Sequence, residues 1–424
     1  MKNIFPAAAL AVLTLAATGP ATAGTDKRAV LATYADIAHA GYEDSLVAGR
    51  TLQSAIQNLI DTPSQAALDG ARAAWIAARV PYMQTEAFRF GNAVVDDWEG
   101  KVNAWPLDEG LIDYVDAGYG TTSEENPVYA ANVVANTSLK VAGKQVDASN
   151  ITKALLQDTL HEFAEVEANV ATGYHAVEFL LWGQDLNGTG PGAGNRPWTD
   201  YAKGGVCTNG NCDRRAAYLA TAMALTLDDL AWIVAQWAPG GEAREALVNG
   251  DADTGLATML TGLGSLSYGE LAGERMKLGL LLHDPEEEHD CFSDNTHNSH
   301  YYDVIGMLNV YSGTYTRIDG RKVMGPALAH LAAEADADAN ATLVNALHAS
   351  ETAFGAMKTR AETTEAYDQM IGADNAAGNA VVQAAIDALT VQTKAIEGVV
   401  AALGLSPIAF EGSDSLDNPE AVFK

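Results

Sequence analysis

Apolar residues recur along the chain at intervals of three and four, whereas strictly alternating apolar and polar runs are nearly absent. The first pattern gathers apolar side chains on one face of a helix, and alternation would instead mark strands. The sequence therefore predicts an all-α protein built from packed antiparallel helices. We expect these helices near residues 27–60, 62–90, 151–184, 214–238, 243–262, 265–283, 296–311, 326–362 and 373–403.

The start of the second expected helix carries the sequence TPSQ at residues 62–65. Thr62 and Gln65 have the spacing of a capping box, and Pro63 suits the first helical position. Pro81 lies farther along the same apolar pattern, where a proline removes a backbone hydrogen bond. We therefore expect this helix to bend at Pro81.

A stretch rich in glycine and proline interrupts the helical pattern near the middle of the chain. Residues 191–212 contain PGAGNRPW and KGGVCTNGNC, which cannot hold a helix. We predict a linker there, between a helical bundle of residues 24–190 and a second bundle of residues 213–404 that packs against it. Each bundle has an ordinary domain size, and residues 405–424 form a tail.

The N-terminus has the three parts of a secretory signal peptide. Lys2 gives a basic start, residues 7–17 an apolar core, and residues 21–23 (ATA) a small-residue cleavage site. No later run reaches the roughly 18 to 20 uninterrupted apolar residues of a membrane span. We therefore expect residues 1–23 to be removed and the protein to be periplasmic without a membrane span, either free or associated with the membrane.

The charge of the chain restricts its partners. There are 55 Asp and Glu residues against 25 Lys and Arg, for a formal net charge of −30. Such a surface repels phosphate backbones and anionic lipids, which argues against nucleic acid as a partner and favours cations. Adaptation of the whole surface to solubility or salt is the alternative explanation of this charge.

The three cysteines fit an oxidising compartment. Cys207 and Cys212 lie close enough in the sequence to form a small disulfide after export. Cys291 is left over, and we expect it to be a buried, inert thiol.

The segment YHAVEFLLWGQD, residues 174–185, places two polar groups in an apolar helix. His175 and Glu178 are three residues apart and therefore share one helix face. Burying either group alone costs several kcal/mol, so the pair needs a partner. Metal sites in carboxylate-bridged helical bundles use Glu and His at this spacing. A hydrogen bond between the two side chains within the core is the alternative.

Two further groups of residues are candidates for the same chemistry. One is a polar stripe at intervals of three and four on the helix that begins near residue 62, followed by the acidic loop NAWPLDEGLIDYV. The other is HDPEEEHDCFSDNTHNSHYYD, residues 283–303, whose imidazoles and carboxylates suit Fe, Zn, Mn or Cu. A solvated face with ordinary ion pairs and a solvated acidic loop are the respective alternatives. The stripe consists of Trp75, Arg79, Tyr82, Glu86 and Arg89, and the second group includes His283, His289, His297 and His300.

Hydrolytic motifs are incomplete in this sequence. Zinc peptidases require HExxH or the inverted HxxEH, and Phe179 stands where the second histidine of the inverted motif would be. There is no GxSxG elbow and no phosphate-cradling loop.

Four segments of the chain resemble those of a known family. GYHAVEFLLWGQD resembles the GxHxxE motif of the imelysin-like proteins, with Gly173, His175 and Glu178 at the motif positions. RVPYMQTEAFRFG, WPLDEGLIDYV and HDCFSDNTHNSHYYD resemble further segments of that family, particularly of its iron-regulated protein A branch. The chain is also similar to the periplasmic component of an elemental iron uptake system, which carries an HxxE metal motif.

The resemblance covers essentially the whole chain after residue 23. It implies an exported, all-helical, two-domain protein connected with iron acquisition, with a ligand site around the GxHxxE helix near the domain interface. The family was once assigned to the metallopeptidases, but the missing second histidine argues against that activity here.

Residues and resemblance together predict an exported iron-binding protein rather than an enzyme. Carboxylates with one imidazole suit Fe2+ or Fe3+, and zinc less well. Two arginines are expected to hold the ligand carboxylates in place. The predicted ligands are His175, Glu178, Glu86 and Asp113, the supporting arginines are Arg79 and Arg89, and an alternative second site comprises Asp294, His297 and His300.

Other interpretations and partners remain open at this point. The first alternative is a metal-dependent peptidase with Glu178 as ligand or base. The second is a pocket in which His175 and Glu178 hydrogen-bond a small molecule or a partner protein. The expected partners are a metal ion and a membrane iron-transport component.

Overall fold

The computed structural model describes residues 24–423, except residues 125 and 142. The predicted signal peptide, residues 1–23, lies outside the described residues. Within these residues the protein is predominantly helical, and its few strands form two short antiparallel hairpins. The expectation of an all-α fold is therefore confirmed.

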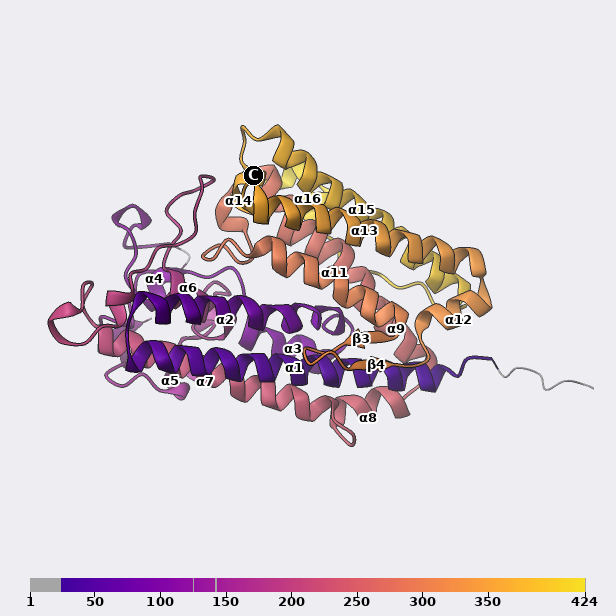
Figure 1. Ribbon diagram of the computed structural model, residues 1–424, viewed down its shortest axis with the longest axis horizontal. Helices are drawn as coiled ribbons and strands as arrows, with labels where there is room; N and C mark the ends of the chain where they lie inside the picture. Colours follow the sequence, from indigo (N-terminus) through magenta and orange to yellow (C-terminus); the bar gives the residue numbers. More distant parts are fainter. Residues whose placement is uncertain (1–23, 125, 142, 424) are drawn as a thin grey trace, which may run out of the picture.

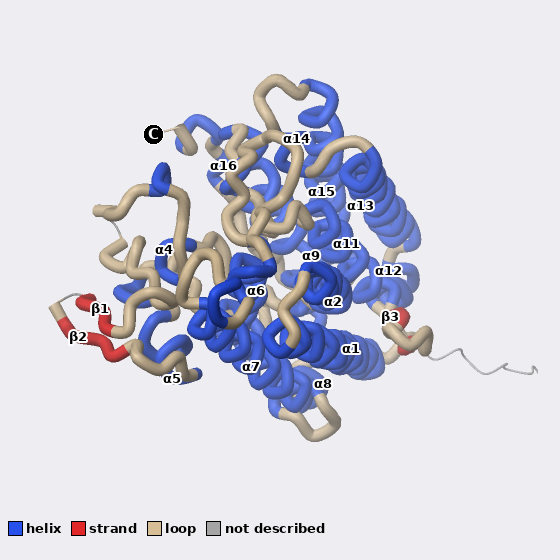
Figure 2. Tube along the Cα trace, turned by 60° about the vertical axis from the view of Figure 1, so that its left-hand side comes forward, coloured by secondary structure: helices blue, strands red, loops and turns tan. Residues whose placement is uncertain are grey.

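The chain before the Gly-rich stretch contains two long helices and several short elements. They are α1 (Lys27–Asp61), α2 (Gln65–Met83), η1 (Glu86–Phe88), α3 (Ala93–Asn103), α4 (Glu109–Ile112), β1 (Ser138–Val141), β2 (Lys144–Asp147), α5 (Lys153–Leu155) and α6 (Gly173–Trp182). The β1–β2 hairpin, with Ser138 opposite Asp147, lies at the margin of the molecule in Figure 2.

The chain after this stretch is almost entirely helical, with one short hairpin. Its elements are α7 (Cys212–Trp237), α8 (Glu242–Asn249), α9 (Ala252–Ser265), the π-helical segment η7 (Leu266–Lys277), α10 (Leu278–Leu282), η8 (Pro285–Glu287), α11 (Thr296–Ser312), β3 (Thr314–Thr316), β4 (Lys322–Met324), α12 (Leu328–Ala335), α13 (Ala337–Thr363), α14 (Tyr367–Ile371), α15 (Ala376–Ala402) and α16 (Asp414–Asp417).

Two groups of helices make up the body of the protein. In the first, α1 packs against α2 and α7, and α6 packs against α2, α3 and α7. In the second, α13 packs against α11 and α15, and α15 packs against η7. Figure 1 shows these groups above and below one another, and α11 joins them by packing against α2. Although α7 follows the Gly-rich stretch, it lies in the first group; the division of the chain into independent domains at 191–212 stays a prediction.

Several expected helix boundaries differ from the structure, and the helix expected over 243–262 is two helices, α8 and α9. The second helix begins at Gln65, where Ser64 rather than Thr62 caps it by accepting a hydrogen bond from the Ala67 backbone N–H at 3.2 Å. This helix ends at Met83, so Pro81 lies in its last turn, where the proline removes one backbone hydrogen bond to the preceding turn. The expected helix over 326–362 is two helices, α12 and α13, with Asp336 capping the second.

The single helix expected over 151–184 is wrong. Short helical turns occupy 153–165, and α6 begins only at residue 173. Glu162 and Ala164 take positive φ angles of 50° and 61°, which break the helix. Asn169 satisfies the exposed backbone there, because its side chain donates to the Phe163 carbonyl at 2.8 Å and its carbonyl accepts from the Glu162 N–H. These hydrogen bonds override the local helical pattern.

The cysteines pair as expected. Cys207 and Cys212 form a disulfide that closes the loop before α7, and Cys291 is a partly buried free thiol.

One stretch, Cys212–Asn249, is long and apolar enough to cross a membrane when judged by length and composition alone. Its main part is α7, which packs against α1 and α6. Tyr218, Leu225 and Trp237 of α7 are buried in these contacts, as in a core helix.

Gly173 determines where α6 starts. Its φ is +84°, and a Cβ atom at this position would lie 2.7 Å from the Val102 carbonyl oxygen at the end of α3. Only glycine combines this backbone conformation with so close an approach to α3. The position of the helix that carries His175 and Glu178 therefore depends on this residue.

We expect Gly173→Ala to lower the free energy of unfolding by about 3 kcal/mol, because backbone strain adds to a collision with α3. Gly120 is the matched control, since its φ is +89° but a Cβ atom there would have no neighbour within 4 Å. Gly120→Ala should cost only about 1 kcal/mol of strain. Urea unfolding followed by tryptophan fluorescence measures both, and equal losses would contradict the role of the α3 contact.

Candidate metal centre

Helix α6 is held in the interior of the protein. All of its residues are buried. The indole N–H of Trp75 on α2 donates to the Tyr174 carbonyl at 3.0 Å, and the Tyr201 hydroxyl donates to the Leu180 carbonyl at 2.5 Å. His175 and Glu178 on α6 therefore have little freedom to move.

His175 and Glu178 form a hydrogen-bonded pair. His175 Nδ1 lies 2.9 Å from Glu178 Oε2, and the exposed fractions of the side chains are 1% and 0%. The other carboxylate oxygen of Glu178 accepts from the Ser293 backbone N–H at 3.0 Å and from its hydroxyl at 2.6 Å. Both oxygens of Glu178 are thus engaged, whereas His175 Nε2 has no hydrogen-bond partner among the described residues.

Burial disfavours the charged form of each member of this pair. Burial, and then the charge of Arg79, lowers the pKa of His175 to about 3. Burial, and then the charge of Asp290, raises the pKa of Glu178 well above its usual value. When both side chains are neutral, the carboxyl group donates to Nδ1 of the imidazole. When the pair loses one proton, the remaining proton lies on Nδ1 of His175, between the ring and Glu178. Nε2 then carries a lone pair, which is the form of histidine that binds metals.

A loop between η8 and α11 brings His289 and Asp290 to this pair. Asp290 Oδ1 accepts from Arg79 at 3.0 Å and lies 3.2 Å from His289 Nδ1. Its Oδ2 accepts from the Asn295 amide at 2.8 Å and from the Ser299 hydroxyl. Burial alone would raise the pKa of Asp290, but Arg79 and His289 lower it well below its usual value. Asp290 is therefore an ionised and firmly positioned carboxylate.

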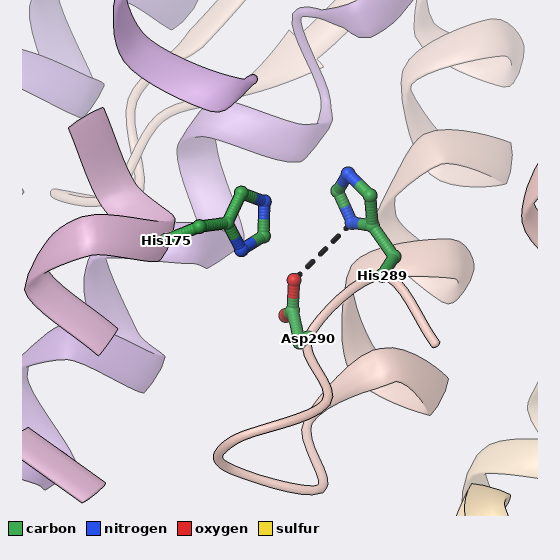
Figure 3. A group of neighbouring side chains, drawn as sticks. All are labelled: His175, His289 and Asp290. Atoms are coloured by element: carbon green, nitrogen blue, oxygen red, sulfur yellow. Dashed lines mark ion pairs between the residues drawn. The ribbon is translucent and has the colours of Figure 1, made fainter. Parts of the chain in front are cut away.

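The three side chains converge in space. One potential ligand atom from each of His175, His289 and Asp290 lies within 4.8 Å of the others, and all three side chains are buried. The ring centroids of the histidines are 4.8 Å apart at 78°. Figure 3 shows the two rings facing one another, with the Asp290 carboxylate between and below them. Residues far apart in the sequence thus build one compact donor group.

This donor group fits a metal ion. A buried nitrogen without a partner, such as His175 Nε2, is costly unless something binds it. Burial, and then Arg275, lowers the pKa of His289 well below its usual value, so this imidazole is neutral as well. Two imidazoles and one carboxylate are the ligand set of ferrous iron sites that keep coordination positions open.

Arg79 supports the site, but not through the carboxylates expected from the sequence. Its guanidinium group donates to Asn103 Oδ1 at 2.5 Å and to Asp290. It also lies over three aromatic rings at 5.2 to 5.6 Å. Arg79 therefore fixes Asp290 and balances its charge. The rings belong to Trp75, Tyr82 and Tyr174.

The structure places Glu86 in a separate cluster of charges. Its Oε2 accepts from Arg275 at 2.7 Å, and Arg275 also pairs with Glu270 at 2.7 Å. Arg89 pairs with Asp96 at 3.1 Å and with Glu270 at 3.2 Å rather than with a ligand of the donor group. Glu86 is not part of the donor group, and its role as a ligand stays a prediction.

Asp113 is engaged by two arginines. Arg196 donates to Oδ2 at 2.7 Å, and Arg215 donates to Oδ2 at 2.5 Å and to Oδ1 at 3.0 Å. Burial alone would raise the pKa of Asp113, but these arginines lower it. The structure does not bring Asp113 into the donor group, so its role as a ligand also stays a prediction.

The residues of the alternative second site lie along the loop before α11 and in its first turn. The His300 ring lies 6.2 Å from that of His289, and its Nε2 is 3.3 Å from the Arg275 carbonyl. Burial, and then Lys358, lowers the pKa of His297 to about 4. Asp294 has a left-handed φ of 54°. The structure does not gather these three into one donor group, and a second metal site stays a prediction.

His289 and Asp290 belong to the donor group but are not among the metal ligands predicted from the sequence. Both belong to the segment 283–303, which stands out by its composition. Nothing in that segment distinguishes these two from its other histidines and carboxylates. Their proximity to His175 depends on the path of the loop.

Comparison with known proteins identifies the family. A family model described as Imelysin matches residues 38–396. Iron-regulated protein A of Synechococcus elongatus is 42% identical over 69 residues, which are 16% of this chain and 19% of that relative. The chain thus matches about a fifth of the length of this curated relative.

Two solved structures share the fold. One, described as an iron-regulated protein A precursor from Parabacteroides distasonis, has a TM-score of 0.63 and 18% identity over 90% of this chain and 97% of that chain. The other, an imelysin-like protein from Psychrobacter arcticum, has a TM-score of 0.55 and 15% identity over 91% and 100%. Because the family model spans most of the chain, and GxHxxE lies on a buried helix of this fold, the protein belongs to the imelysin family.

Proposed function

We propose that the protein is an exported iron-binding protein that serves iron acquisition and holds an iron ion between His175, His289 and Asp290. The observation that carries this proposal is the convergence of one donor atom from each residue within 4.8 Å, in a fully buried position. The name of one relative, iron-regulated protein A, supports a connection with iron.

The donor set is suited to iron. Two neutral imidazoles and one carboxylate suit Fe2+, and zinc would accept the same ligands in a tetrahedral arrangement. No cysteine thiolate belongs to the set, so metals that seek sulfur gain nothing from it. Glu178 would support the ligand His175 without touching the metal. A carboxylate hydrogen-bonded to Nδ1 fixes the orientation of the imidazole ring and makes Nε2 a stronger ligand.

The cellular setting forms part of the proposal. The predicted signal peptide would deliver the protein to the periplasm, and the Cys207–Cys212 disulfide suits that oxidising compartment. A membrane iron-transport component would then receive the ion.

A peptidase finds less support in the site. A zinc peptidase needs a carboxylate placed to activate water, but both oxygens of Glu178 are bonded to His175 and Ser293. The second histidine of the inverted motif is Phe179. No peptide cleavage is therefore expected, with or without a chelator.

Replacing either histidine should abolish stoichiometric iron binding. We expect His175→Ala and His289→Ala each to weaken Fe2+ binding by at least about 100-fold, because each removes a ligand. Anaerobic titration followed by metal analysis measures this loss. Circular dichroism would establish that each variant is folded.

His348 is the matched control. It pairs with Glu351 at the same spacing and at 3.0 Å, but its side chain is 63% exposed on α13. His348→Ala should leave iron binding unchanged. Retention of tight iron binding by folded His175→Ala protein would contradict the proposed centre.

Iron affinity should rise with pH because of Glu178. Burial raises the pKa of this carboxyl group, and an ion bound at His175 favours its ionised form, so metal binding is coupled to release of protons. We therefore expect the affinity to increase with pH over the range in which Glu178 loses its proton, by at most about tenfold per pH unit. Glu178→Gln should flatten this dependence and weaken binding by about 10- to 100-fold. A wild-type affinity independent of pH, measured by competition with a chelator, would exclude this proton release.

A further inference from the structure

An open pocket of about 410 Å³ lies beside the donor group. Five glutamates and two arginines line it, so its formal charge is negative. Four residues that form its walls are buried, and one of them is His289, which also belongs to the donor group. The pocket therefore reaches from solvent to a proposed ligand of the iron. Its charged residues are Arg89, Glu99, Glu162, Glu167, Glu270, Glu274 and Arg275.

The rim of the pocket carries free carboxylates. Glu162, Glu167 and Glu274 are exposed, and none forms an ion pair with another residue of the described chain. The two arginines, in contrast, are each bound by several carboxylates. The field at the mouth is therefore set by the three glutamates.

The floor of the pocket offers an unused hydrogen-bond donor. Asn103 is 2% exposed, and its Oδ1 accepts from Arg79, which fixes the orientation of the amide. Its Nδ2 is buried and has no partner among the described residues. A donor in this position suits an acceptor oxygen atom, such as that of an ordered water molecule on the pocket floor.

We infer that this pocket is the route by which a small hydrated cation reaches His289, and that the rim glutamates draw the cation in. The inference rests on the proposed function and names the form in which iron is taken up. Carboxylates that line a cleft raise the local concentration of cations and their association rate. An anionic ferric chelate would meet a rim of its own sign, which disfavours that form of iron.

Four other cavities fit this role less well. Four further pockets of about 260 to 380 Å³ open on the surface of the described residues. None of them is lined by His175, His289 or Asp290. The pocket lined by His289 therefore has the most direct relation to the donor group.

The inference is tested by removing the negative charges from the rim of the pocket. The triple variant Glu162→Gln, Glu167→Gln and Glu274→Gln removes the three free carboxylates while leaving the donor group intact. The matched control Glu242→Gln, Glu397→Gln and Glu420→Gln removes the same charge from exposed residues on α8, α15 and the C-terminal segment, none of which lines the pocket.

Stopped-flow mixing with anaerobic Fe2+ measures the association rate. Trp105 lines the pocket with its ring 5.8 Å from that of His289, so quenching of its fluorescence reports arrival of the ion. At low salt we expect the rim variant to bind about tenfold more slowly than the wild type, with unchanged stoichiometry. The control should bind at the wild-type rate, and near 1 M salt the rates should converge because the charges are screened.

The possible results distinguish a failure of the proposed cation route from a failure of the proposed iron-binding function. If the wild type and the rim variant bind Fe2+ at equal rates at low salt, the inference is wrong and the proposed function stands. If the control variant slows as much as the rim variant, the total charge and not the pocket governs uptake, which also overturns the inference. If loading from ferric citrate is faster than from Fe2+ and becomes faster still in the rim variant, the pocket takes an anionic chelate instead, which overturns the inference. If the wild type binds no iron, the proposed function itself fails.

Discussion

The site depends on one constraint, which is that a charge removed from water must find a partner of opposite sign. Arg79 is 1% exposed and pairs with Asp290, and this ion pair joins α2 to the loop before α11. Removing either partner would leave the other charge buried alone, which is far more costly than losing an exposed ion pair. The packing of the loop, and with it the position of His289, follows from this pair.

The same constraint explains why two carboxylates expected as ligands lie elsewhere. The helical spacing places Glu86 on the same stripe as Arg79, and the sequence indicates that much. Arg275 lies 189 residues farther along the chain and pairs with Glu86, while Arg196 and Arg215 pair with Asp113. Which buried acid meets which buried base is decided by the tertiary fold, and no local pattern carries that information.

Local sequence patterns nevertheless predict several main features of the structure. The helical class, the paired cysteines and the buried His175–Glu178 pair all follow from residue spacing and composition. The pair His348 and Glu351 shows the limit, since it has the same spacing and nearly the same hydrogen-bond length but faces solvent. What distinguishes the two pairs in the sequence is the apolar surrounding of the first. The helix expected over 151–184 failed because Asn169 stabilises a non-helical backbone through contacts that periodicity cannot report.

The hydrogen bonds from Ser293 to Glu178 join residues that are 115 positions apart in the chain. An ion bound by His175, His289 and Asp290 would close the same long loop from the other side of the imidazole. Because the ion would bind only the folded arrangement of these three residues, it would stabilise the folded state. Loaded protein would therefore resist mechanical or proteolytic opening of the loop before α11, and release of the ion to a recipient would coincide with loosening of that segment.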